Sequence, residues 1–383
     1  MAGKERRTRI AKGATEQVDT LLADIRNLIL SARRAVVRSV DTLQVLTSFE
    51  IGRRIVEHEQ QGTRRAAYGK LVVEELAKRL TTEFGKGFSK SNLEYMRRFY
   101  AMYRDRYPSI AQTVSGQLAL RGKAQTPSGQ SPAVPLAPRS ASLKPPFALG
   151  WSHYVRLMGI GDSEERAFYE IEAVENGWSI RELKRQVNSG LYERLALSQD
   201  KRGIRKLARH GQIVGRPQDL LKEPYVLEFL GLDEKAAYSE TDLESAIIDK
   251  LEHFLLELGK GFLFEARQKR FTFDADHFFV DLVFYNRLLR CFVLIDLKIG
   301  KVTHQDLGQM QMYVNYFDRQ VKRENEQPTV GIILCKKKHD ALVEITLPKN
   351  ANIHAREYRL FLPSKEELKR KLVEWSEEKQ GLA

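Results

Sequence analysis

The stretch that decides the fold is FFVDLVFYNRLLRCFVLIDLKI, residues 278–299. It contains two apolar runs rich in Phe, Val, Ile and Leu, which favour β-strands over 278–286 and 291–299. The residues between these runs, Arg287 to Arg290, form a segment of suitable length for the loop of an antiparallel hairpin. The sequence therefore predicts that the two strands pair as a hairpin.

Each predicted strand of this hairpin contains one acid. If the hairpin is centred on its loop, Asn286 faces Cys291, and counting back in that register places Asp281 opposite Asp296. Facing residues in a sheet have Cβ atoms about 4.5–5.5 Å apart, and like charges at that distance destabilise the pair unless something neutralises them. A divalent cation would do so, and oxygen-only ligands favour Mg²⁺ or Mn²⁺ over zinc.

Lys298 follows Asp296 at a spacing of two, so both side chains project to one face of the strand while Ile295 and Leu297 point to the other. A lysine there can orient or help to deprotonate an attacking water and stabilise charge on a phosphorane-like transition state. The alternative is a surface hairpin with a harmless Asp–Lys pair. Strands rarely hold polar residues inside apolar runs without a reason, which favours the first interpretation.

The flanking sequence predicts an α/β domain around the hairpin. From Thr241 the pattern changes from helices alone to helices mixed with strands. In chain order we expect a helix over 241–258, the strand FLFEARQKRFTF (262–273), the hairpin, a helix over about 304–318, the apolar strand TVGIILC (329–335) and a helix from Ser364. The predicted domain spans 236–383, after a connector over 199–235. Cys291 and Cys335 lie in apolar runs and are expected to be buried thiols.

The first part of the chain is basic and helical. Residues 1–150 contain 26 Lys+Arg against 13 Asp+Glu, whereas residues 151–383 contain 37 of each, so the whole net charge of +13 lies in the first part. Apolar residues at three- and four-residue spacing predict an all-α domain over 1–198, interrupted by a disordered Pro/Ser/Ala-rich insertion at 121–150. The charge indicates a polyanionic partner, and DNA is favoured over an acidic protein or an anionic membrane.

Residues 76–103, LAKRLTTEFGKGFSKSNLEYMRRFYAMY, have the outline of a helix-turn-helix. A helical piece leads to a turn with Gly85 and Gly87, and Ser89 or Ser91 caps a second helix. An ordinary helical hairpin with a solvated basic face fits the pattern equally well. The second helix has four residues whose types suit phosphates and base edges: Lys90, Asn92, Arg97 and Arg98.

These motifs resemble a known group of proteins. Asp281 followed by Asp-Leu-Lys at 296–298 resembles the PD-(D/E)XK nuclease superfamily. FVDLVFYNRLLRCFVLIDLKIGKVTHQDLGQMQMYVNYFD (279–318) is similar to the nuclease domain of the bacterial YhcG family. The segments similar to its helical N-terminal domain are AYGK, FGKGFS, NLEYMRRFY, WSHY and WSIRELKRQVNSGLYERL. The resemblance implies an α+β protein with a C-terminal restriction-endonuclease-like α/β domain.

The resemblance also implies a metal site made by Asp281, Asp296 and Lys298, with Mg²⁺ or Mn²⁺ as the cofactor. The family usually has Glu where this chain has Asp296, and the shorter side chain could shift the metal geometry. A further acid normally comes from the preceding helix, and Glu244 is the match. Glu244 shares a helical stripe with apolar residues and so faces the sheet. However, Thr241-x-x-Glu244 also fits a capping box, which would explain Glu244 without a metal.

Two further pairs are candidates for supporting roles. Gln309 and Tyr313 lie four apart on one helical face and resemble a Gln-x-x-x-Tyr element that several nucleases of this superfamily place beside the metal to hold DNA or water. Arg267 and Gln268 on the preceding strand could contact phosphates, although a solvated strand edge explains them as well.

We therefore expect a Mg²⁺-dependent DNA endonuclease, acting in DNA repair, recombination or defence against foreign DNA. The alternatives are a non-catalytic DNA-binding protein with a nuclease-like fold, and an RNase, because the site itself does not distinguish sugars. A homodimer is an option by analogy with nucleases that make double-strand cuts. The N-terminus lacks an apolar segment after its basic residues, and no run approaches membrane-spanning length, so a cytoplasmic protein without membrane association is expected.

Overall fold

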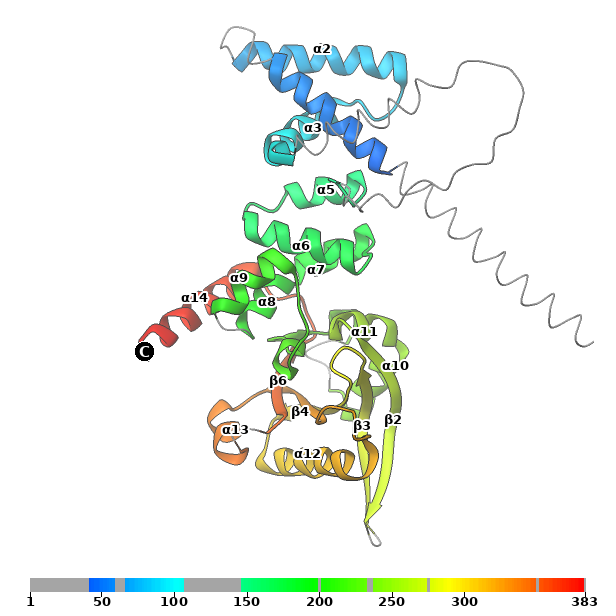
Figure 1. Ribbon diagram of the computed structural model, residues 1–383, viewed down its shortest axis with the longest axis vertical. Helices are drawn as coiled ribbons and strands as arrows, with labels where there is room; N and C mark the ends of the chain where they lie inside the picture. The colour runs from blue at the N-terminus through cyan, green and yellow to red at the C-terminus, as the bar shows by residue number, and fades with distance from the viewer. Residues whose placement is uncertain are drawn as a thin grey trace, which may run out of the picture. The chain divides into compact units, whose positions relative to one another are not determined.

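The computed structural model describes residues 41–58, 66–106, 146–198, 201–232, 237–273, 276–348 and 351–381 (Figure 1). The chain divides into two compact units, Met1–Gly161 and Asp162–Ala383. The predicted insertion at 121–150 lies almost entirely outside the described residues. The helical residues 162–198 belong to the same unit as the sheet, while the domain boundaries 1–198, 199–235 and 236–383 stay predictions.

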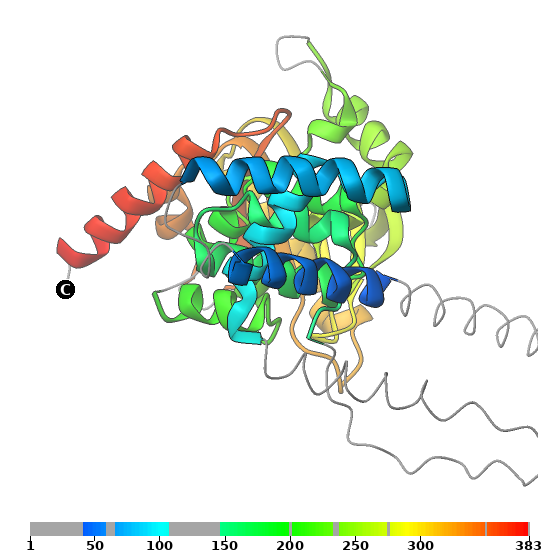
Figure 2. The ribbon, with the colours of Figure 1, turned by 90° about the horizontal axis from the view of Figure 1, so that it is seen from above.

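The first unit is built from helices. Residues 41–58 are helical, followed by α2 (Ala66–Phe84), α3 (Lys90–Tyr103), a short 3₁₀ segment (Arg104–Arg106) and α5 (Trp151–Met158). Figure 2 shows α3 lying between α2 and the helix of residues 41–58, and apolar residues of all three meet in one cluster. Buried members of this cluster are Ile55, Val73, Ala77, Leu93 and Met96.

The turn between α2 and α3 follows the predicted outline. Gly85 and Gly87 both have positive φ, of 80° and 114°, a conformation that side chains with a Cβ rarely adopt. Ser89 caps α3, since its side chain accepts a hydrogen bond from the backbone N–H of Asn92. The helix before the turn is longer than the short piece expected.

Four helices begin the second unit: α6 (Ser163–Glu175), α7 (Ile180–Asn188), α8 (Leu191–Leu197) and α9 (Lys201–His210). They are attached to the sheet region by buried charges. Arg194 of α8 is fully buried and donates hydrogen bonds to both carboxylate oxygens of Glu257. Glu257 also accepts from Arg185 of α7, and its backbone carbonyl accepts from buried Lys222.

Among the described residues, six strands form one mixed sheet in the order β1-β6-β5-β4-β3-β2. The strands are β1 (Tyr225–Val226), β2 (Phe262–Phe273), β3 (Asp276–Asn286), β4 (Cys291–Lys301), β5 (Val330–Lys337) and β6 (Ile353–Arg359). Strands β2, β3 and β4 pair antiparallel, whereas β4, β5, β6 and β1 pair parallel. The parallel strands therefore end at the same edge of the sheet.

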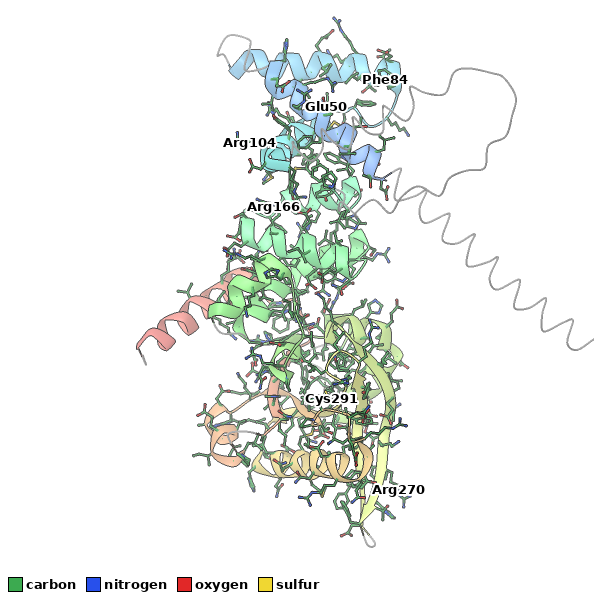
Figure 3. All side chains as sticks on the ribbon, in the orientation of Figure 1. Glu50, Phe84, Arg104, Arg166, Arg270 and Cys291 are labelled. Carbon is green, nitrogen blue, oxygen red and sulfur yellow. The ribbon has the colours of Figure 1, made fainter. Side chains whose placement is uncertain are left out.

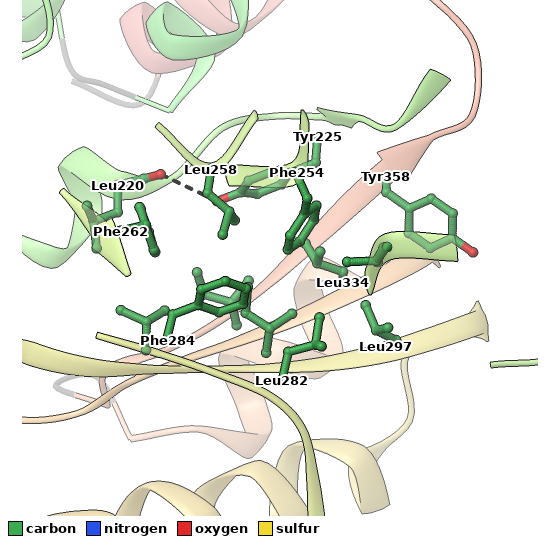
Figure 4. Packing of buried hydrophobic residues seen from close by; sticks show 14 of the residues in the cluster. Leu220, Tyr225, Phe254, Leu258, Phe262, Leu282, Phe284, Leu297, Leu334 and Tyr358 are labelled. Carbon is green, nitrogen blue, oxygen red and sulfur yellow. Dashed lines mark hydrogen bonds between the residues drawn. The ribbon is translucent and has the colours of Figure 1, made fainter. Parts of the chain in front are cut away.

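Helices cover both faces of this sheet. One face packs against α10 (Glu240–Asp249) and α11 (Leu251–Leu258), with Leu243, Phe254 and Leu258 in its core (Figure 4). The other packs against α12 (His304–Tyr316), whose Met310 is fully buried there. Alternation along β4 decides this division, because Val293, Ile295 and Leu297 enter the first core and Leu294 the second.

The structure confirms the α+β class and most of the predicted elements. The predicted helix 241–258 is interrupted at Lys250, whose φ of −117° and ψ of 31° are not helical. The predicted helix 304–318 ends as α12 at Tyr316 and continues as a short π-helical segment, Phe317–Val321. The structure adds β1, β6, α13 (Asp340–Thr346) and two 3₁₀ segments, Pro217–Leu220 and Glu228–Leu230; α14 (Lys365–Gly381) follows Ser364 as predicted.

Both cysteines are buried free thiols, as predicted. Burial raises the pKa of Cys291 and of Cys335 to about 12, so both remain protonated at neutral pH. In the described part of the chain, no helix is long and apolar enough to cross a membrane.

Candidate active site

The candidate site begins at the hairpin of β3 and β4. Asn286 pairs with Cys291, and the same register continues to the pair Leu282 and Ile295, as predicted from the loop. One step further, that register would bring Asp281 opposite Asp296. The backbone pairing ends before this step, and Oδ2 of Asp281 accepts a hydrogen bond of 2.8 Å from the backbone N–H of Leu297. The side chain of Asp281 is thereby fixed beside β4.

Asp296 is a buried acid in an apolar strand. The residue is 3 % exposed, and its Oδ2 forms an ion pair with Nζ of Lys298 at 2.9 Å. Burial, and after it the nearby carboxylate of Asp281, raise the pKa of Asp296 to about 7, although Lys298 acts in the opposite direction. The two acids are therefore close enough to oppose each other's ionisation.

Lys298 lies among carboxylates. Besides Asp296, Glu240 approaches its Nζ at 3.6 Å and Asp306 at 3.9 Å. Burial alone would lower the pKa of Lys298, but Asp296 and then Glu240 outweigh it and the pKa is raised. Lys298 is therefore a cation at neutral pH.

Sequence reasoning missed Glu240 and Asp306. Glu240 is the first residue of α10, and Asp306 belongs to the capping box of α12, in which Thr303 is the N-cap. Acids are common at these positions for reasons of helix capping and the helix dipole. Only the packing of both helix starts against the end of β4 places them near Lys298.

Glu244 points inward from α10, as its helical stripe predicts, and is 4 % exposed. The alternative capping box at Thr241 is wrong, because the box is formed by Ser239 and Asp242. Both carboxylate oxygens of Glu244 have partners: Oε1 accepts from Arg267 at 2.6 Å and Oε2 accepts from Gln268 at 2.7 Å.

Gln268 connects Glu244 with Asp281. Its Nε2 donates to Glu244 and also to Oδ1 of Asp281, at 3.0 Å. Gln268 has a φ of 47°, unusual for a residue within a strand, and this conformation turns it away from regular alternation in β2. Arg267 donates to Glu244 and to Ser245. In the structure both predicted phosphate-contacting residues therefore support the acids of the site.

Gln309 and Tyr313 contact each other, in agreement with their spacing on α12. Tyr313 is almost fully buried, and its hydroxyl donates to the carbonyl oxygen of Phe279 on β3 at 2.8 Å. Burial raises the pKa of Tyr313 to about 12, with a smaller contribution from Asp296. The pair attaches α12 to the strand that contains Asp281.

The chemistry of the two facing acids fits a hard divalent cation. A buried carboxylate whose pKa is raised by a second carboxylate is stabilised by a cation placed between the two. No group of three or more His, Cys, Asp or Glu side chains arranged to hold a metal occurs within the described ranges. Asp281 and Asp296 could thus provide two protein ligands, while Glu244 reaches the site through Gln268.

The four predicted DNA-contacting residues of α3 differ in their contacts and in their exposure. Lys90 forms an ion pair with Glu74 of α2. The side-chain amide of Asn92 donates to the carbonyl of Gly87 and accepts from Nε1 of Trp151 at 2.9 Å, so it is engaged within the unit. Arg97 is half-buried and Arg98 is exposed.

Figure 3 places the hairpin residues in the second unit, with Cys291 inside it and Arg270 on the long ribbon of β2 and β3. The candidate site is built on β2, β3 and β4, together with the helices α10 and α12. All elements of the site therefore belong to the unit that begins at Asp162.

Comparison with known proteins finds two families, which match different parts of the chain. A family described as the YhcG PDDEXK nuclease domain matches residues 218–373, which include the whole candidate site. A second family, described as the DUF1016 N-terminal domain, matches residues 24–194.

One curated relative is similar over nearly its whole length. The protein named "Putative nuclease YhcG" from Escherichia coli (strain K12) is 40% identical over 365 residues, which cover 95% of this chain and 96% of that protein. Two solved structures are also similar over part of the chain. They are a repair endonuclease from Pyrococcus abyssi (18% identity, 33% of this chain and 50% of that chain, TM-score 0.23) and an EndoMS–dsDNA complex (17%, 35% and 50%, TM-score 0.23).

The nearly full-length relative and the two family matches confirm the resemblance seen in the sequence. The chain belongs to the YhcG family, in which a DUF1016 N-terminal domain is joined to a PDDEXK nuclease domain.

Proposed function

We propose that this chain is a metal-dependent endonuclease that hydrolyses phosphodiester bonds of DNA. The observation that supports it most is the meeting of Asp281, buried Asp296 and Lys298 at the end of one hairpin. Two acids that resist ionising together, beside a lysine that stays charged, form a suitable place for a hard cation and a phosphate. Lys298 alone does not offset the repulsion between the acids, because the pKa of Asp296 stays raised beside it.

In this proposal Asp281 and Asp296 hold Mg²⁺ or Mn²⁺. Such an ion, when bound, polarises a phosphate oxygen and lowers the pKa of an attacking water. Gln268 keeps Asp281 oriented by donating to Oδ1, and Glu244 keeps Gln268 in place. These contacts limit the rotation of the Asp281 carboxylate, and hydrogen bonds that orient a ligand in this way tune metal affinity.

Lys298 has the role of a fixed positive charge. Because its pKa is raised by Asp296 and Glu240, it is a poor base and a good partner for a phosphate oxygen. A cation already in position stabilises the charge that develops on the phosphorus-bound oxygens without reorganisation during the reaction. This assigns charge stabilisation and water orientation to Lys298 rather than removal of a proton from water.

DNA binding in this proposal is shared between the two parts of the chain. The first 150 residues have the whole excess of positive charge, and α3 has the exposed Arg98 on its surface. Phosphate contacts of this kind hold DNA without sequence specificity. We further propose a cytoplasmic role in DNA repair, recombination or defence against foreign DNA, with a homodimer as the form that would make double-strand cuts.

The test is cleavage by the purified full-length protein. Supercoiled plasmid, branched DNA and single-stranded RNA are each incubated with Mg²⁺, with Mn²⁺ and with a chelator. We expect cleavage of DNA that requires the ion and disappears in Asp281→Asn. Asp276→Asn is the matched control, because Asp276 is an exposed acid at the start of the same strand.

Three results would contradict the proposal in different ways. Tight DNA binding without cleavage under any condition would favour the non-catalytic DNA-binding alternative. Cleavage of RNA alone would favour an RNase. Equal activity in Asp281→Asn and wild type would show that another site cuts.

A further inference from the structure

A basic cavity lies at the sheet edge where the parallel strands end. It has a volume of about 550 Å³ and is lined by the last residues of three adjacent strands. Each of these strands ends in a cation: Lys301 on β4, Lys337 on β5 and Arg359 on β6. Lys336 also lines the cavity, and Glu357 is the acid among the lining residues. The cavity thus has an excess of positive charge.

Two of these cations face each other in the sheet. Lys301 and Lys337 are direct partners in the register between β4 and β5, and both are exposed. Neighbouring strands are about 4.8 Å apart, and like charges directly opposite each other are destabilising. Among the described residues, no carboxylate lies within ion-pair distance of either lysine, whereas Arg359 pairs with Glu367 at 3.4 Å. An anion bound between the lysines would relieve their repulsion.

The cavity is next to the candidate active site along the same strand. Lys301 follows Lys298 by three residues on β4, and the register with β5 shifts between the two lysines. Glu240 connects the two places, since Oε1 accepts from the backbone N–H of Ile299 at 3.3 Å and Oε2 is 3.6 Å from Lys298. At Gly300, between them, an added Cβ would meet no heavy atom within 4 Å, so the strand surface is open at that residue.

We propose that this cavity binds a backbone phosphate of the DNA strand that is cut, close to the scissile bond. The proposal rests on the function proposed above. Lys301 and Lys337 clamp one phosphate between them. The apolar lining, Ile299 and Leu360, is suited to the sugar beside it.

Glu357 does not cancel this charge. One of its oxygens accepts from the backbone N–H of Lys338 at 3.3 Å, which holds the carboxylate at the cavity wall. The lining cations outnumber it, so a phosphodiester remains the favoured ligand.

The experiment uses full-length protein carrying Lys301→Gln and Lys337→Gln together. DNA affinity is measured with one labelled duplex over a series of salt concentrations, without divalent ions so that cleavage does not interfere. Each phosphate contact contributes about 0.9 to the slope of log affinity against log salt, so the double variant, which loses one phosphate contact, should lose roughly 0.9 of that slope. The control is Lys206→Gln with Lys369→Gln, which removes the same charge from exposed positions on α9 and α14.

A second measurement distinguishes a loss of phosphate binding from a folding defect. Without DNA and at low salt, the melting temperature of the double variant should be equal to or higher than that of wild type, because a like-charge pair is removed. Lys301→Arg with Lys337→Arg should keep the wild-type slope. An unchanged slope in the folded Gln variant, or an equal loss in the control, would overturn the proposal.

Failure of the cavity and failure of the nuclease function give different results. If wild type cuts DNA but the slopes are equal, the site cleaves and the cavity does not bind phosphates. If wild type binds DNA without cutting it and the Gln variant alone loses slope, the cavity binds phosphates and the proposed chemistry is wrong.

Discussion

Two clusters of buried charge lie in the second unit, and they differ in whether the charges balance. Around Glu257, burial alone would raise its pKa, but Arg194, Lys222 and Arg185 lower it to about 2. Arg185 also pairs with Glu182 and Glu228, so three cations meet three carboxylates there. Around Asp296, burial and Asp281 raise the pKa to about 7 although Lys298 is in contact. The balanced cluster stabilises the fold, and the unbalanced one leaves a demand for a cation that a substrate or metal can satisfy.

The largest expected effect tests the unbalanced cluster. Lys298→Ala should reduce DNA cleavage by about 10³-fold or more, since it removes the cation that would face the phosphate. The protein should still fold and bind DNA. Single-turnover cleavage, circular dichroism and DNA affinity measure the three properties, with Lys269→Ala as a control on the edge strand β2 of the same sheet. Full activity in Lys298→Ala would exclude the proposed role.

The balanced cluster should respond in stability instead. Arg194→Met leaves Glu257 without its principal partner and should lower the free energy of unfolding by about 3–5 kcal/mol. Chemical denaturation measures this change. Replacing both residues, Arg194→Met with Glu257→Leu, should recover part of the loss because the carboxylate is removed together with its partner, while Lys222 and Arg185 still lose one acid. A loss in the double variant as large as that in the single one would argue against this pairing.

Gln268 tests how the acids of the unbalanced cluster are held in place, since it joins the buried Glu244 to Asp281. Gln268→Ala should lower cleavage by about 10–100-fold, the usual cost of losing a partner that orients a metal ligand. Higher Mg²⁺ should restore part of the activity, a response that a general folding defect would not give. Equal activity at all Mg²⁺ concentrations would mean that Asp281 needs no such support.

The smallest effect is the pH dependence of stability without metal. Asp296 has a pKa of about 7 in the folded chain against an ordinary 3.8, so the folded state retains a proton that the unfolded state releases in this range. Stability contributed by that proton is therefore lost as pH rises from 3.8 to about 7. Asp296→Asn should remove this loss, and Mg²⁺ should reduce it. Melting temperatures at several pH values provide the measurement.

Glu257 should give the opposite sign in the same experiment. Its pKa of about 2 lies below the ordinary 4.5, so its contribution to stability is lost as pH falls through this range. A wild-type profile without metal that kept rising between pH 4.5 and 7 would contradict the difference between the two clusters.

The hairpin was predictable because a loop of defined length sets the register of an antiparallel pair. That single inference placed Asp281 beside Asp296, and strand alternation placed Lys298 on the same face. Glu240, Asp306 and the bridge made by Gln268 were not predictable in this way, because they depend on how two helix starts and a strand irregularity pack against the hairpin. The sequence contains no local signal for that packing.

Strand β6 and the break at Lys250 were not predicted for similar reasons. Strand β6, IHAREYR, alternates His, Arg and Glu with residues that enter the core, and its polar members are half-buried between neighbours. Such a mixture does not resemble the apolar runs of β4 and β5. The break at Lys250 was hidden because lysine is a good helix former and the apolar periodicity continues across it.

Arg194 is the last residue matched by the N-terminal family, and Glu257 lies well inside the nuclease family. Two segments that are recognised separately are thus joined by one buried pair of opposite charges. A chimera that combined these segments from two distant relatives would have to inherit both partners together. A truncated nuclease fragment starting near residue 218 would expose Glu257 without Arg194, so the smallest independently stable nuclease is expected to include α8.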